Sequence, residues 1–195
     1  MSGATPDGAL PPTPSQTVGP FFSFGLEWKD GPFAVPEGTA GAIRIEGRLL
    51  DGLGHPVPDG LIETWQADPD GRFAHPDDPR GAVEWGDFRG FARCPTDGEG
   101  RWSVLTLKPG PIPGPGDSVQ APHLAVTVLA RGLLARLVTR IYFADEEERN
   151  AADPVLRSLR GGDKERATMI AAPVEGGYRH DIHLQGPDET VFLAI

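Results

Sequence analysis

The chain of 195 residues contains 26 glycines and 21 prolines, which disfavours a helical bundle and favours short strands joined by tight turns. Its formal net charge of −10 makes the surface repel phosphate backbones and anionic headgroups, so we expect neither nucleic acid nor membrane as a partner. The single cysteine, Cys94, excludes an internal disulfide and indicates a reducing, cytoplasmic compartment.

Residues 1–40 are rich in proline and glycine, a composition typical of an extended arm. The segment 17–24 carries three phenylalanines, which water solvates poorly unless protein covers them. We therefore expect the arm to pack on the surface of its own chain and of a partner, with a flexible tail as the alternative. Residues 1–16 lack the basic and apolar regions of a signal peptide, and we expect no membrane-spanning segment.

Residues 41–195 are expected to form a single domain made mainly of strands. From Ala42 onwards, Ile43 and Ile45 alternate with charged residues, the pattern of a half-buried strand. Short apolar or alternating runs bounded by turn residues predict the other strands. These runs are 60–66, 90–94, 101–107, 123–129, 137–142, 178–184 and 190–193.

Two segments, 145–159 and 164–171, have helical character, and Asp153-Pro154 is a cap followed by a first-turn proline that would divide the first of them. The predicted fold class is therefore all-β. It is a β-sandwich of short, mainly antiparallel strands, with an extended N-terminal arm and one or two short helices.

Several sequence blocks together resemble the intradiol ring-cleaving dioxygenases, a β-sandwich family that uses non-haem Fe(III). Three of them, in chain order, are Trp65–Phe73 (WQADPDGRF), Lys108–Pro113 (KPGPIP) and Ala121–Ala125 (APHLA). Two further blocks, Thr13–Pro20 (TPSQTVGP) and Leu129–Leu134 (LARGLL), extend the resemblance from about Thr13 to the C-terminus.

Catalytic members of that family hold iron with two tyrosines and a His-x-His pair. Phenolates suit hard ferric iron, and histidines two apart on a strand reach the same side. Where the motif requires these ligands, this chain has Phe73, Ile112, and His123 with Ala125. Phenyl, sec-butyl and methyl groups donate no lone pair, so we expect no metal ligand and no catalytic residue in this chain, and a structural role for His123.

The remaining histidines and tyrosines do not rebuild such a site. His180 and His183 are three apart in a predicted strand and should point to opposite faces, as solvent-facing or hydrogen-bonded side chains. Tyr142 ends a strand, which indicates packing. The sequence also lacks a nucleophile elbow, a phosphate loop and a dinucleotide fingerprint in its strand-turn-helix context.

The resemblance implies that this chain works beside a partner. The family includes enzymes that pair an alpha with a beta subunit of the same fold, with iron in beta near the interface and alpha forming part of the pocket wall. On this basis we expect an alpha-type chain that binds no cofactor itself, a beta subunit that holds Fe(III), and protocatechuate and O2 as substrates. The implied substrate-binding positions are Thr17, Gly19, Pro20 and Arg131.

Arg131 is the most informative of these positions, because protocatechuate carries a carboxylate and a guanidinium stays charged. A direct salt bridge to substrate and an indirect orienting role remain open, and an ordinary surface arginine is the bland alternative. The interface should be permanent and larger than roughly 2,000 Å². We expect the phenylalanine-rich arm and the apolar tail, residues 191–195, to contribute to it.

Two other functions remain open. The first is a β-sandwich binding or scaffold module without a catalytic partner, and a neighbouring gene that encodes both tyrosines and the His-x-His pair would argue against it. The second is an independently active homo-oligomer with unrecognised ligands, which stoichiometric iron in the chain expressed alone would support.

Overall fold

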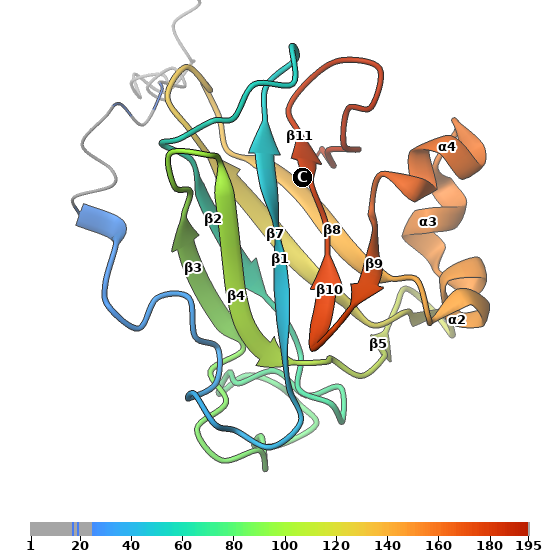
Figure 1. Cartoon of the computed structure of the whole chain (residues 1–195). Coiled ribbons are helices and arrows are strands. Elements are labelled where there is room, and N and C mark those ends of the chain that lie inside the picture. Colours follow the sequence, from blue (N-terminus) through green and yellow to red (C-terminus); the bar gives the residue numbers. More distant parts are fainter. Residues whose placement is uncertain (1–16, 18, 20–24, 195) are drawn as a thin grey trace, which may run out of the picture.

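The computed structural model describes residues 17, 19 and 25–194 of the chain. Strands make up most of this part, and short helices gather along one side (Figure 1). The strands are β1 Ala42–Leu50, β2 Leu61–Trp65, β3 Phe91–Pro95, β4 Arg101–Leu107, β5 Ile112–Pro113, β6 Val119–Gln120, β7 His123–Leu129, β8 Leu137–Phe143, β9 Ile170–Val174, β10 Gly177–Arg179 and β11 Ile182–His183. The helices are α2 Glu147–Ala152, α3 Pro154–Ser158 and α4 Gly162–Ala167.

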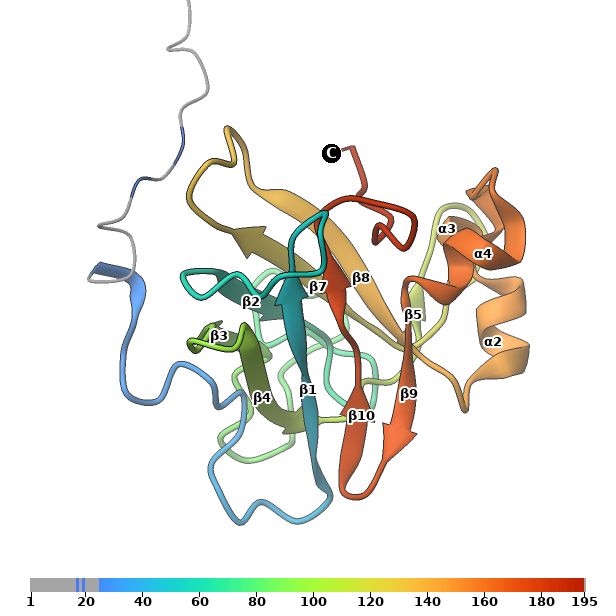
Figure 2. The same cartoon turned by 45° about the horizontal axis from the view of Figure 1, so that its top comes forward.

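Nine of the strands form one strongly bent sheet in the order β4-β1-β10-β9-β8-β7-β2-β3, with β11 continuing beside β1, and β5 and β6 form a separate pair. Strands β4, β1, β10 and β9 lie in front of β2, β7 and β8, so the sheet folds over on itself as two layers (Figures 1 and 2). Most neighbouring pairs are antiparallel, and β1 with β10, β1 with β11 and β8 with β9 are parallel. The predicted all-β sandwich is confirmed.

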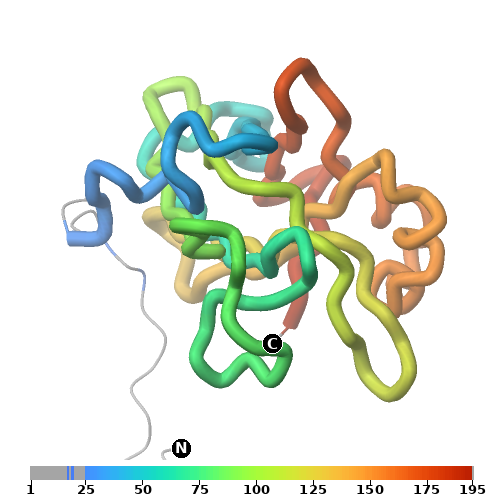
Figure 3. Tube along the Cα trace, turned by 90° about the horizontal axis from the view of Figure 1, so that it is seen from below, coloured from blue at the N-terminus to red at the C-terminus, as the bar shows by residue number. Residues whose placement is uncertain are grey.

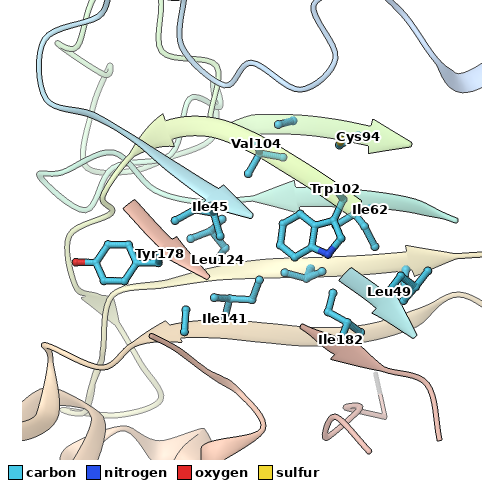
Figure 4. Close-up of a cluster of buried hydrophobic side chains, with 14 of the residues drawn as sticks. Ile45, Leu49, Ile62, Cys94, Trp102, Val104, Leu124, Ile141, Tyr178 and Ile182 are labelled. Atoms are coloured by element: carbon cyan, nitrogen blue, oxygen red, sulfur yellow. The ribbon is translucent and has the colours of Figure 1, made fainter. Parts of the chain in front are cut away.

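The core fills the space between the two layers (Figure 4). Alternate residues of each strand point inward, as the period of two requires, so Ile45 and Leu49 of β1 face Leu124 of β7 and Ile141 of β8. These side chains are fully buried. Burial of such side chains is worth about 1.5–3 kcal/mol each and fixes which face of every strand looks outward.

The predicted strand 178–184 is interrupted at His180 and Asp181, which belong to neither β10 nor β11. A Cβ atom at Gly47 would lie 1.7 Å from the His180 carbonyl oxygen, so β1 and the interrupted strand approach closely only because residue 47 is glycine. The Arg48 amide donates to Asp181 Oδ1 at 2.9 Å instead of to a ladder carbonyl. The strand then resumes as β11 in unchanged register with β1.

The prediction of a strand at 190–193 is wrong. Residues 190–194 run without regular structure, although Thr190 and Leu193 donate backbone hydrogen bonds to His183 and Val138. The half-buried side chains of Val191 and Leu193 pack beside α3, and Phe192 packs against the main core. Much of this apolar tail is therefore covered by its own chain, which leaves less of it for an interface than expected.

Asp153 divides the helical segment as predicted. Its Oδ1 accepts hydrogen bonds from the amides of Val155 and Leu156 at 2.8 and 3.1 Å, and Pro154 opens α3. The described part therefore contains three short helices, α2 to α4, rather than one or two. None of them has the length and apolar character needed to span a bilayer.

The second predicted helix, 164–171, is wrong at its C-terminal end. Helix α4 stops at Ala167, and Ile170 begins β9 beside β8. The Tyr142 amide donates to the Met169 carbonyl at 2.8 Å, and Met169 and Ala171 are fully buried. Pairing and burial at the sheet edge outweigh the local helical preference.

The described end of the arm is hydrogen-bonded to both β3 and β4. Gly31 O accepts a hydrogen bond from the Arg93 amide at 2.7 Å, and Pro32 O accepts one from the Leu105 amide at 2.9 Å. Ala34 is 1% exposed. Figure 3 shows this blue segment crossing the end of the sandwich where the loop between β2 and β3 also lies. The phenylalanines at 21, 22 and 24 lie outside the described residues.

Candidate functional site: an iron-site position without iron ligands

Three of the five motif blocks found in the sequence, 65–73, 108–113 and 121–125, meet at one small cavity of about 30 Å³. Its lining contains all the positions that the family pattern reserves for metal ligands. The lining residues are Trp65, Gln66, Ala67, Phe73, Gly110, Ile112, His123 and Ala125. The fold therefore brings these positions together from β2, β5, β7 and two loops.

Backbone contacts between the loops explain how Ile112 comes to lie near Phe73. A Cβ atom at Gly71 would lie 2.4 Å from Pro111 O, and one at Gly110 would lie 2.3 Å from Pro69 O. Gly71 also has φ +80°, which side-chain-bearing residues rarely adopt. On the sheet, Trp65 pairs with Ala125, and His123 follows two residues away on the same face.

Phe73 is held as a packing residue. Its ring stacks on Trp65 with centroids 5.8 Å apart and planes 2° from parallel, and the Arg80 guanidinium lies 5.4 Å from its centroid. Asp78 fixes Arg80 through hydrogen bonds of 2.8 and 2.6 Å. These bonds hold the pKa of Asp78 well below its usual range, so the carboxylate stays charged and keeps Arg80 over the ring.

His123 is 9% exposed, and burial lowers its pKa to about 4. The ring is therefore neutral at pH 7, with Nδ1–H donating to Ala121 O at 2.7 Å. Gln66, the other polar side chain of the lining, is occupied, because its Nε2 donates to Leu107 O and its Oε1 accepts from Thr106. One imidazole nitrogen among apolar side chains does not fit Fe(III), which binds several hard anionic donors.

The two tyrosines of the chain lie outside this cavity. Tyr142 donates to Asp153 Oδ1 at 3.1 Å, and Tyr178 donates to Asp145 Oδ2 at 2.9 Å. Burial raises the pKa of both phenols, so neither is a ready phenolate. Tyr142 is fully buried, in agreement with its predicted packing role. Among the described residues, no three His, Cys, Asp or Glu side chains are placed to share a metal ion.

His180 and His183 both contribute to the lining of a cavity of about 360 Å³. His180 is 5% exposed, burial lowers its pKa to about 4, and its Nε2 has no hydrogen-bond partner within the described structure. His180 is therefore a buried neutral side chain rather than a solvent-facing one.

Two of the residues expected to form a pocket wall, Thr17 and Arg131, lie elsewhere, at the loop that joins β7 to β8. Thr17 Oγ1 accepts a hydrogen bond from the Gly132 amide at 3.0 Å, which brings Thr17 next to Arg131. Gly19 has φ +70°, and Pro20 lies outside the described residues. Arg131 is exposed and pairs with Asp59, a contact for which the sequence carries no motif.

These residues and the ligandless cavity lie at opposite ends of β7. His123 begins the strand and Leu129 ends it, so at about 3.3 Å per residue the two are roughly 20 Å apart. In Figure 1 the β7–β8 loop is at the top, whereas the loop between β2 and β3 is at the bottom. Arg131 therefore cannot line the cavity around His123.

Comparisons with known proteins agree with this picture. Residues 18–186 match the family model described as Dioxygenase. The chain is 40% identical over 206 residues to the protocatechuate 3,4-dioxygenase alpha chain of Burkholderia cepacia, covering 95% of this chain and 98% of that one. It is 37% identical over 200 residues to the alpha chain of Pseudomonas putida, covering 94% and 96%. It is 36% identical over 156 residues to the beta chain of Burkholderia cepacia, covering 76% and 66%.

Solved structures share the fold. The dioxygenase domain of a carbohydrate-binding fusion from Streptomyces sp. SirexAA-E aligns with a TM-score of 0.57 and 23% identity, covering 90% of this chain and 99% of that one. Catechol 1,2-dioxygenase from Acinetobacter sp. ADP1 aligns with a TM-score of 0.58 and 20% identity, covering 78% and 55%. At these identities the alignments concern the fold alone.

Proposed function

Because the chain belongs to the intradiol dioxygenase family, we propose that it is an alpha-type subunit of an enzyme that cleaves protocatechuate. The family uses non-haem Fe(III), and we place this ion in a beta-type partner subunit. The observation that supports this proposal most directly is the cavity around His123. The family's ligand positions line it, and they carry a single nitrogen donor and apolar side chains. The reaction is O2-dependent opening of the ring between its two hydroxyl-bearing carbons, which yields 3-carboxy-cis,cis-muconate.

The chain's own contribution is to bind and orient the substrate and to exclude water from the partner's site. Thr17, Gly19, Pro20 and Arg131 form this part of the wall in our proposal. Arg131 supplies a permanent positive charge for the substrate carboxylate. Arg131 lies about 20 Å along β7 from the cavity around His123. This distance supports a role for Arg131 in the site of a neighbouring chain rather than in a site of this chain.

The arm over residues 1–40 is proposed to pack partly on this chain and partly on the partner, ahead of the domain 41–195. Its contacts with Arg93 and Leu105 support packing on this chain. Packing on the partner is proposed mainly for the segment with Phe21, Phe22 and Phe24. A single buried cysteine, Cys94, is compatible with the cytoplasmic location that we propose.

The test is an Arg131→Ala variant in the complex co-purified with the product of the neighbouring gene. We expect the KM for protocatechuate to rise by roughly tenfold or more, because a hydrogen-bonded charge pair with the carboxylate is lost. Iron content should not change. With catechol, which lacks the carboxylate, KM should hardly move.

Arg136→Ala is the matched control, since Arg136 is an exposed arginine of the same loop. An unchanged KM for protocatechuate in Arg131→Ala would show that Arg131 does not bind the substrate. The absence of any iron-binding partner that co-purifies would favour the scaffold function instead.

A further inference from the structure

Asp59 and Arg131 come close together because β2 and β7 are paired. Leu61 of β2 pairs with Leu129 of β7 in an antiparallel ladder. Asp59 lies in the turn that precedes β2, and Arg131 lies in the turn that follows β7, each two residues beyond that pair. The Arg131 Nε–H donates to Asp59 Oδ2 there.

The backbone beside Asp59 is anchored to the core. The Gly60 amide donates to Thr96 Oγ1 at 2.8 Å, and the Thr96 amide donates to Gly60 O at 2.9 Å. Thr96 is 7% exposed. A Cβ atom at Gly60 would lie 2.4 Å from Leu49 Cδ2, so the turn sits tightly on the core. The backbone next to Asp59 is therefore held in place, which limits where its carboxylate can lie.

The backbone that carries Arg131 is held from the other side. Gly132 has φ +86°, and its amide donates to Thr17 Oγ1 of the arm. The Leu133 amide donates to Ala130 O at 3.3 Å and closes a tight turn around Arg131. With the turn fixed, the remaining freedom of Arg131 is in its long side chain, whose rotamers the contact with Asp59 restricts.

We propose that Asp59 is a positioning residue that orients the Arg131 guanidinium towards the substrate carboxylate, an inference that rests on the proposed function. A guanidinium offers five N–H donors in a planar fork. Asp59 occupies the Nε edge, which leaves the Nη1 and Nη2 groups, for which the described residues supply no partner, free to receive a second carboxylate. Arg131 and Asp59 side chains are 59% and 29% exposed, so the pair lies where an incoming chain and substrate can reach it.

The experiment compares Asp59→Ala and Asp59→Asn in the co-purified complex, with protocatechuate as the probe. Asp59→Ala removes the partner of Nε–H, so we expect KM to rise roughly three- to fivefold, as expected for a partly exposed ion pair, with kcat and iron content unchanged. Asp59→Asn keeps an oxygen that can accept from Nε–H and should restore most of the lost affinity.

A double-variant cycle separates positioning from a general structural effect. In the Arg131→Ala background, Asp59→Ala should add no further rise in KM. Asp163→Ala is the control, because Asp163 forms an exposed ion pair with Arg166 on α4, away from β7. It should leave KM unchanged.

Three outcomes would overturn the inference. The first is a normal KM in Asp59→Ala while Arg131→Ala binds poorly, which would leave the proposed function intact. The second is an equal effect of Asp59→Ala with and without Arg131, which would show that Asp59 does not act through Arg131. The third is a normal KM in Arg131→Ala, which would overturn the role of Arg131 as well.

Discussion

At the scale of single residues, chemistry at a few positions separates this chain from an iron-binding relative. Phe73, Ile112 and Ala125 could be assigned from the sequence because motif blocks fix their place, and the structure brings all three to one cavity with His123. No sequence motif indicates the contact between Asp59 and Arg131. It follows from the β2–β7 register, which cannot be fixed until the strands are paired.

Two buried histidines should make stability depend on pH. Burial lowers the pKa of His123 and His180 from about 6.5 to about 4 in the folded chain, so between these values the unfolded chain binds more protons. Their contribution to stability is complete above pH 6.5 and is lost as the pH falls towards 4. In that window, each histidine should lower the free energy of unfolding by up to about 1.4 kcal/mol for every unit by which the pH falls.

The measurement is the thermal midpoint of the co-purified complex between pH 7 and pH 5. We expect the midpoint to fall on acidification, and to fall less in His180→Gln, where no buried imidazole must be charged. His75→Gln, at an exposed position, should behave like the unaltered protein. An identical fall in His180→Gln and the unaltered protein would refute this explanation.

At the scale of elements, local signals sufficed where they agreed with tertiary packing. The alternating pattern located β1, and Asp153-Pro154 located the boundary between α2 and α3. Prediction failed at β9, because burial of Met169 and Ala171 against the sheet overrides a helical composition. It also failed at the break between β10 and β11, which depends on the close approach of His180 to Gly47.

Asp153 should stabilise the helical side of the sandwich more than an ordinary cap does. It is fully buried and accepts hydrogen bonds from the amides of Val155, Leu156 and Ala121 and from the Tyr142 hydroxyl. Asp153→Ala should therefore destabilise the chain by about 3 kcal/mol or more, because a lost cap costs about 1 and each abandoned buried donor costs about 1–3. Chemical denaturation of the complex measures this.

The control for Asp153→Ala is Glu146→Ala at the start of α2, where the side chain makes no capping hydrogen bond. It should cost clearly less. A loss below about 1 kcal/mol for Asp153→Ala would mean that the surrounding donors find other partners.

At the scale of the whole molecule, two places lie at opposite ends of β7. The lower end carries the small cavity with His123, lined mainly by apolar side chains, and the upper end carries Arg131 close to Thr17. The sandwich could be predicted from composition and strand spacing. The separation of the two places could not, because it depends on which end of β7 each block reaches after folding.

The most direct test of this account is the distribution of iron between the two subunits of the co-purified complex. We expect separation of the subunits to leave stoichiometric iron, and the colour of phenolate bound to ferric iron, with the partner. This chain, expressed alone, should be colourless and unable to oxidise protocatechuate. Stoichiometric iron bound by this chain on its own would contradict the account.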